Sequence, residues 1–224
     1  TTYAVMSFAI SQIEINMWLD VFILLPLIIL GLNRLLNQKK FILYYLTLTI
    51  LFIQNYYFGY MVAIFLVLYF LIQISKESCL KVIGRQWLDF TVVSILAGLS
   101  SCVMLLPTYL DLSTHGEKFS SFTEWFTENS WFIDLFAKNF VGAYDTTKFG
   151  SIPMIYVGIF PLILAIIFFT IKSIKWQTRL ASGIVLLLII ASFYLEPLDL
   201  MWQGMHSPNM FLHRYSWAFS LMMI

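Results

Sequence analysis

Long apolar runs are the feature that most restricts how this chain of 224 residues can fold. Four runs, at about 18–36, 88–110, 153–172 and 180–198, are long enough to cross a bilayer as helices. Charged residues make up only 11% of the chain, less than half the share in an ordinary soluble domain. The mean hydropathy of +0.84 excludes a soluble fold, a disordered chain and a nucleic-acid binder with a basic surface. The sequence predicts an all-α, polytopic transmembrane helix bundle.

The apolar stretch 41–75 is too long for one membrane crossing. As a single helix it would measure about 52 Å, whereas the hydrocarbon core is roughly 30 Å thick. Because Gln54 and Asn55 interrupt it near its middle, we expect two shorter helices hinged there. The chain then has about six crossings and a truncated seventh at 213–224. We expect 1–224 to form a single transmembrane domain within a longer protein.

The distribution of positive charge predicts the orientation of the chain. Nine of the 13 basic residues fall in three connectors: Arg34, Lys39 and Lys40; Lys76, Lys81 and Arg85; Lys172, Lys175 and Arg179. Cytoplasmic loops of membrane proteins are enriched in Lys and Arg. The three connectors are therefore predicted to be cytoplasmic, and the hinge at 54–57 and the large loop 111–152 to be external.

The external loop carries aromatic residues at near-helical spacing between about 121 and 140, with acids interleaved. This pattern is typical of an amphipathic helix that lies on the outer leaflet. A segment that only covers the helix bundle fits the same pattern, so both interpretations stay open.

Motifs of soluble enzymes, such as a phosphate-binding loop or a nucleophile elbow, do not occur in the sequence. The candidate site residues are instead polar groups at the predicted outer boundary. Glu14 and Asp20 flank the start of the first run and are candidate catalytic contributors, able to hold a divalent cation or orient a hydroxyl. Asp20 also fits a simpler role as a negative charge near a helix N-terminus.

A second candidate lies at the predicted hinge, where Asn55 is followed by Tyr56 and Tyr57. An amide next to two phenols suits sugar binding by hydrogen bonds and stacking. Tyrosines also gather at membrane interfaces without any such function.

A third candidate set precedes the final apolar run and contains His206, Asn209 and Arg214. The guanidinium of Arg214 can bind a phosphate with two hydrogen bonds. It can equally extend to the interface and pair with Glu196 or Asp199. His206 and His213 are seven residues apart, but Pro208 between them favours a loop, and we assign no metal ligands.

Several strings of the sequence resemble segments of YfhO-like bacterial membrane proteins. The strings at 16–20 and 25–31 resemble "NIMWLD…LPLIILG", and 54–61 resembles the hinge "NYYxGYM". Those at 152–162 and 208–216 resemble "PxxYxGxxPL" and "PNxFxxRYSF". The strings occur in the same order over almost the whole chain. One departure is Leu212-His213, where the family pattern has Pro-Tyr.

This resemblance implies a membrane glycosyltransferase of the GT-C type. Such an enzyme takes a sugar from a polyprenyl-phosphate donor and transfers it outside the plasma membrane. In Gram-positive bacteria the acceptor would be a cell-envelope glycopolymer of the teichoic-acid kind. The main catalytic carboxylate of GT-C enzymes usually lies in the first external loop, which on this interpretation is upstream of Thr1. A divalent cation, Mg²⁺ or Mn²⁺, would suit the phosphate leaving group.

Two alternatives come from other classes of protein. A transporter or flippase of lipid or polymer usually places ionisable groups near the bilayer midplane and contains inverted repeats. In this sequence the polar groups collect at one boundary, which favours the enzyme. A structural membrane subunit would tolerate any change in the external loop.

Overall fold

The computed structural model describes residues 3–4, 6–12, 16–115, 125–127, 139, 153–206 and 212–224. These residues form α-helices and one isolated β-bridge, between Phe126 and Leu195. The prediction of an all-α fold is confirmed. The chain divides into two compact units: unit 1 is Thr1–Glu14 with Phe119–Ile224, and unit 2 is Ile15–Lys118. The single transmembrane domain over 1–224 stays a prediction.

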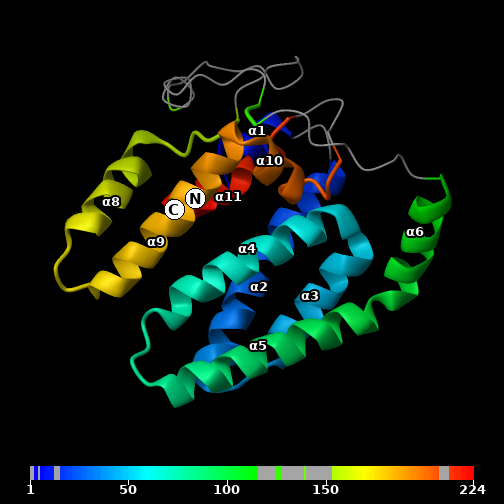
Figure 1. The fold of residues 1–224 in the computed structure, drawn as a ribbon, viewed down its shortest axis with the longest axis horizontal. Helices are drawn as coiled ribbons and strands as arrows, with labels where there is room; N and C mark the ends of the chain where they lie inside the picture. Colours follow the sequence, from blue (N-terminus) through cyan, green and yellow to red (C-terminus); the bar gives the residue numbers. More distant parts are fainter. Residues whose placement is uncertain are drawn as a thin grey trace. The chain divides into compact units, whose positions relative to one another are not determined.

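Unit 2 is a bundle in which α2, α3, α4 and α5 lie side by side (Figure 1). Its helices are α2 (Asn16–Gln38), α3 (Ile42–Gln54), α4 (Tyr56–Ile74), α5 (Leu80–Ser100) and α6 (Cys102–His115). The helices α2 and α3 approach closely at Gly31, where an added Cβ would lie 2.6 Å from the backbone nitrogen of Tyr44. Small residues let membrane helices pack with their backbones close together.

Hydrogen bonds between side chains connect the helices of unit 2. Asn33 of α2 donates to the hydroxyl of Tyr69 in α4 at 3.1 Å. The hydroxyls of Tyr44 and Ser94 are 2.9 Å apart and join α3 to α5. Such bonds stabilise helix association in an apolar surrounding, where the hydrophobic effect between helices is weak.

The helix break predicted in the stretch 41–75 is confirmed at Asn55. This residue is extended, with φ −150° and ψ 91°, and is both the C-cap of α3 and the N-cap of α4. Its side-chain oxygen accepts from the backbone N–H of Phe58 at 3.0 Å. Asn is a favoured N-cap residue because its short side chain satisfies one of the unpaired N–H groups at a helix start.

The crossing predicted at 88–110 is displaced in the structure. The helix begins at Leu80, so Lys81 and Arg85 lie on α5 instead of in a loop, and it ends at Ser100. At the break, the hydroxyl of Ser101 donates to the carbonyl of Ala97 at 2.8 Å. A serine bonded to the preceding turn bends a helix, and hydropathy alone does not reveal this.

Unit 1 contains α1 (Ser7–Ser11), α8 (Ile159–Thr170), α9 (Trp176–Tyr194), α10 (Glu196–Trp202) and α11 (Ser216–Met223). Two predicted spans have different limits: 153–172 is helical only from Ile159, and 180–198 is divided between α9 and α10. Pro197 lies in the first turn of α10. Because proline has no backbone N–H, it is tolerated in the first turn of a helix but not in its interior, so the division falls at this place.

The predicted external loop 111–152 is described at 111–115, 125–127 and 139. Residues 111–115 belong to α6. Trp125–Thr127 are bridged to the end of α9: the N–H of Thr127 donates to the carbonyl of Tyr194, and the N–H of Glu196 to that of Trp125. Trp125–Thr127 are thus not helical, and an interfacial helix somewhere between about 121 and 140 stays a prediction. Its other positions lie outside the described residues, apart from Asn139.

Four described helices are long and apolar enough to cross a membrane: Trp18–Gln38, Tyr56–Ile74, Leu80–Ser100 and Trp176–Tyr194. Two apolar helices, Ile42–Gln54 and Ile159–Thr170, are shorter. A helix of 13 residues such as α3 measures about 20 Å, less than the hydrocarbon thickness. The count of six crossings stays a prediction.

Candidate functional site

Asp20 and Gln54, from two of the predicted candidate segments, meet at one end of unit 2. The amide of Gln54 donates to Oδ2 of Asp20 at 3.0 Å, and the pair is exposed. Asp20 lies in the second turn of α2, and no acid occupies the first turn. The pairing with Gln54 thus describes Asp20 better than a charge at the helix N-terminus does.

The predicted hinge residues lie beside this pair and differ in exposure. The side-chain oxygen of Asn55 caps α4, so this residue has a structural role in addition to any contact with a sugar. Tyr56 is 43% exposed. The ring of Tyr57 stands edge-on to Phe58, with centroids 6.0 Å apart. Among these three residues, Tyr56 has the side chain best exposed for stacking on a ligand.

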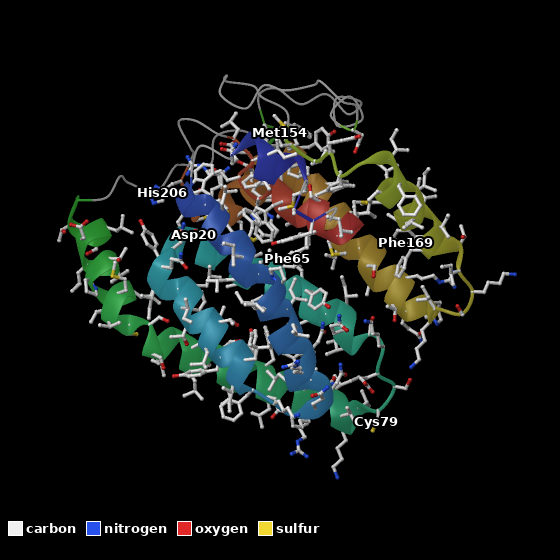
Figure 2. The ribbon with its side chains drawn as sticks, turned by 180° about the vertical axis from the view of Figure 1, so that it is seen from behind. Asp20, Phe65, Cys79, Met154, Phe169 and His206 are labelled. Atoms are coloured by element: carbon white, nitrogen blue, oxygen red, sulfur yellow. The ribbon has the colours of Figure 1, made fainter. Side chains whose placement is uncertain are left out.

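The basic connectors of unit 2 lie at the opposite end from the Asp20–Gln54 pair. Figure 2 shows Asp20 at one end of the unit and Cys79, in the connector between α4 and α5, at the other. At the Cys79 end, Lys39 donates to Asp89 of α5 at 2.7 Å. The Asp20–Gln54 pair thus lies at one end of the bundle, and the basic connectors lie at the other.

In unit 1, a buried polar cluster forms around Asp199 of α10. The short helix α10 ends in a turn in which Gly204 has φ +69° and the N–H of Met205 donates to the carbonyl of Leu200 at 2.7 Å. This bond pattern closes a helix through a residue in the left-handed region, which glycine adopts most easily. The turn fixes where α10 ends and where the chain leaves it.

Asp199 is hydrogen-bonded through both carboxylate oxygens. Gln203 donates to Oδ2 at 2.6 Å. Tyr215 donates to Oδ1 at 2.8 Å, and Nδ1 of His213 lies 3.0 Å from the same oxygen. We refer to Asp199, Gln203, His213 and Tyr215 as the Asp199 cluster, and all four residues are buried. A buried carboxylate is stable only when donors surround it in this way.

Tyr215 also forms the centre of an aromatic stack. Its ring lies nearly parallel to Phe193 of α9 and Trp202 of α10, at centroid distances of 5.2 and 5.1 Å. Its hydroxyl is 2.6 Å from the carbonyl oxygen of Ser192. Tyr215 precedes α11 and lies outside the four long apolar helices.

Arg214 stands between two members of the Asp199 cluster. His213 has φ +55°, in the left-handed region, where a non-glycine residue costs about 1–2 kcal/mol. Arg214 is half-buried and directly precedes Tyr215, the N-cap of α11. His206 is also half-buried and follows the turn that closes α10. Glu14 and Asn209 lie outside the described residues.

From the sequence, Asp199 was predicted only as an ion-pair partner of Arg214, and Tyr215 had no predicted role. A signal for the cluster is present in the sequence. Asp199 stands between two leucines, and Gln203 follows it by four residues, the spacing at which Asp and Gln side chains meet on a helix. An acid within an apolar segment needs partners, and His213 and Tyr215 are polar residues two positions apart.

A divalent cation has little support from the described donor groups. Nowhere in the described ranges do three His, Cys, Asp or Glu side chains come together. The Asp20–Gln54 pair offers one carboxylate and one amide, whereas Mg²⁺ usually needs one or two carboxylates besides substrate phosphate and water. The cation stays a prediction, and the mechanism proposed below includes no step that uses it.

Comparison with known proteins identifies the family. The family model described as "Bacterial membrane protein YfhO" matches residues 1–224. No curated protein and no solved structure matches the chain. The chain therefore belongs to the YfhO family of bacterial membrane proteins, as its motifs indicated.

Proposed function

We propose that this chain is part of a membrane glycosyltransferase that transfers a sugar from a polyprenyl-phosphate donor to a cell-envelope glycopolymer of the teichoic-acid kind. The observation that carries the proposal is the exposed Asp20–Gln54 pair at the end of unit 2 opposite the basic connectors. By the positive-inside rule this end faces outward. An exposed carboxylate held by an amide donor is well suited to orient the hydroxyl group of an acceptor.

The reaction would proceed by displacement at the anomeric carbon. The acceptor hydroxyl oxygen forms a bond to this carbon while the bond from carbon to the phosphate oxygen breaks. The hydroxyl proton passes to a carboxylate base, with Glu14 and Asp20 as candidate contributors. The polyprenyl phosphate leaves with the bonding electron pair. Separately, and from the sequence, we propose that Arg214 of unit 1 binds a phosphate group, because its planar guanidinium matches two phosphate oxygens.

Arg214 gives the sharpest test of this proposal. In the full-length protein, we expect Arg214→Lys to lower the transfer rate about tenfold and Arg214→Ala about a hundredfold, since a charge-assisted bidentate contact is lost in part or entirely. The measurement is transfer of labelled sugar from a polyprenyl-phosphate donor by the protein reconstituted in lipid vesicles.

Arg179→Lys is the matched control. Arg179 of α9 donates to the carbonyl of Phe169 at 3.1 Å and belongs to the predicted cytoplasmic connector. Its replacement should leave the rate unchanged. If both Arg214 variants transfer sugar at the wild-type rate at equal expression, the donor phosphate binds elsewhere.

The orientation is tested by labelling single cysteines in intact cells. Starting from a protein without Cys79 and Cys102, we expect an impermeant thiol reagent to label Tyr56→Cys and not Gln38→Cys. The reason is that position 38 adjoins the basic connector after α2, and position 56 follows the hinge. Labelling at position 38 would overturn the assignment of the two faces.

One observation favours a transporter or flippase as the second candidate. The Asp199–His213 pair is buried, and buried ionisable pairs are common along transport pathways. The two functions differ in their product. A transporter would move the lipid-linked sugar across vesicle membranes without attaching it to an acceptor, so analysis of the acceptor polymer separates them.

A further inference from the structure

We propose that Asp199 is a positioning residue for Arg214. This inference rests on the proposed function, because it concerns how Arg214 would be presented to the donor phosphate. It goes beyond that function in assigning a role to a buried carboxylate that neither the sequence motifs nor the reaction requires.

The contacts of one carboxylate oxygen carry the argument. Oδ1 of Asp199 lies 3.0 Å from Nδ1 of His213 and 2.8 Å from the hydroxyl of Tyr215. These two residues immediately precede and follow Arg214 in the chain. The residues on both sides of Arg214 are therefore tied to the same atom, and the backbone between them can take few conformations.

Two features show that this segment is held in place and is not merely folded by local preference. His213 adopts φ +55°, a conformation that persists only where surrounding contacts compensate for its cost. The ring of Tyr215 is fully buried between Phe193 and Trp202. His213, which has the strained backbone, and Tyr215, which has the packed ring, both contact Asp199 of α10.

The carboxylate itself is fixed from its other side. Oδ2 of Asp199 accepts from Gln203 at 2.6 Å, one helical turn later on α10. A side chain bound through both oxygens has few alternative rotamers. The side chain of Arg214 keeps its own rotamers, but a fixed backbone reduces the backbone entropy that is lost when Arg214 binds a phosphate.

The test measures phosphate recognition directly by binding, without turnover. Full-length protein in nanodiscs is titrated with polyprenyl monophosphate and, separately, with the uncharged polyprenol. The ratio of the two affinities reports the phosphate contact alone, because both ligands share the same apolar chain. Loss of packing without loss of positioning would change both affinities together and leave the ratio constant.

We expect Asp199→Leu to lower this affinity ratio about tenfold, since the tie to both neighbours of Arg214 is lost. Asp199→Asn keeps an acceptor oxygen for His213 and Tyr215 and should restore most of the ratio. Ser192→Ala is the matched control: it removes a hydrogen bond from Trp202 in the same buried region, at 3.1 Å, and touches no carboxylate oxygen of Asp199. Its ratio should equal that of the wild type.

Where Asp199→Leu does not fold, the two contacts are removed one at a time. Tyr215→Phe keeps the aromatic stack, and His213→Asn keeps a residue type that tolerates positive φ. Each should lower the ratio severalfold. A wild-type ratio in both of these variants, or in a folded Asp199→Leu protein, overturns the positioning role. An equal fall in Ser192→Ala overturns it as well.

Arg214→Ala in the same titration separates this inference from the proposed function. If Arg214→Ala loses the preference for phosphate and Asp199→Leu keeps it, only the positioning role is wrong. If Arg214→Ala itself keeps the preference, Arg214 does not bind the phosphate and both proposals are wrong.

Discussion

Replacing Gly31 with alanine is expected to destabilise unit 2 more than any other exchange of a described glycine for alanine. The added Cβ would lie 2.6 and 2.7 Å from the backbone nitrogen and Cα of Tyr44. Backbone atoms cannot rotate away as the end of a side chain can, so α2 and α3 must move apart. Overpacking of this kind costs about 1–3 kcal/mol or more. The measurement is thermal unfolding of the purified protein in detergent.

The same exchange at Gly98 gives the matched control. Gly98 is also in a long helix, α5, and an added Cβ there would meet nothing within 4 Å. Alanine stabilises a helix interior by about 1 kcal/mol relative to glycine, so Gly98→Ala should unfold at an equal or higher temperature. Equal unfolding temperatures for the Gly31 and Gly98 variants would contradict the close packing of α2 on α3.

Tyr215→Ala is expected to have the largest effect in unit 1. It empties the fully buried space between Phe193 and Trp202, and truncation of a large buried aromatic ring costs about 3–5 kcal/mol. It also removes the hydroxyl that contacts Asp199. Loss of a partner from a buried polar group adds about 1–3 kcal/mol. Limited proteolysis and thermal unfolding should both detect the change.

Tyr215→Phe separates the ring from the hydroxyl. Phenylalanine keeps the stack and loses only the bonds to Asp199 and to the carbonyl of Ser192. We expect a fall in stability that is less than half of that in Tyr215→Ala. If phenylalanine and alanine destabilise the protein equally, the hydroxyl and not the aromatic stack holds α9, α10 and α11 together.

The features of the fold that depend on hydropathy and on local chemistry could be predicted from the sequence. Apolar runs identified the helical class, and a polar interruption in an overlong run located the break at Asn55. The limits of α5 were not predicted, because Lys81 and Arg85 indicated a loop. In the structure both residues lie in the first turns of α5. The division between α9 and α10 depends on Pro197, a signal that hydropathy averages away.

For the candidate sites, the sequence identified residue types and not their partners. Asp20 and the hinge that follows Gln54 were selected separately from the sequence. The antiparallel pairing of α2 and α3 places the side-chain amide of Gln54 3.0 Å from Oδ2 of Asp20. The Asp199 cluster joins residues 14 and 16 positions apart. Such contacts depend on how two helices and a turn pack, which no local pattern encodes.

The junction between α3 and α4 restricts how the length of this chain can vary. Asn55 is the only residue between the two helices, and its N–H, carbonyl and side chain all take part in their end bonds. One inserted residue would therefore have to extend a helix, which rotates everything beyond it by about 100°. Tyr69 would then face away from Asn33. Insertions and deletions should be rare here among homologous sequences, although chain reversals usually tolerate them.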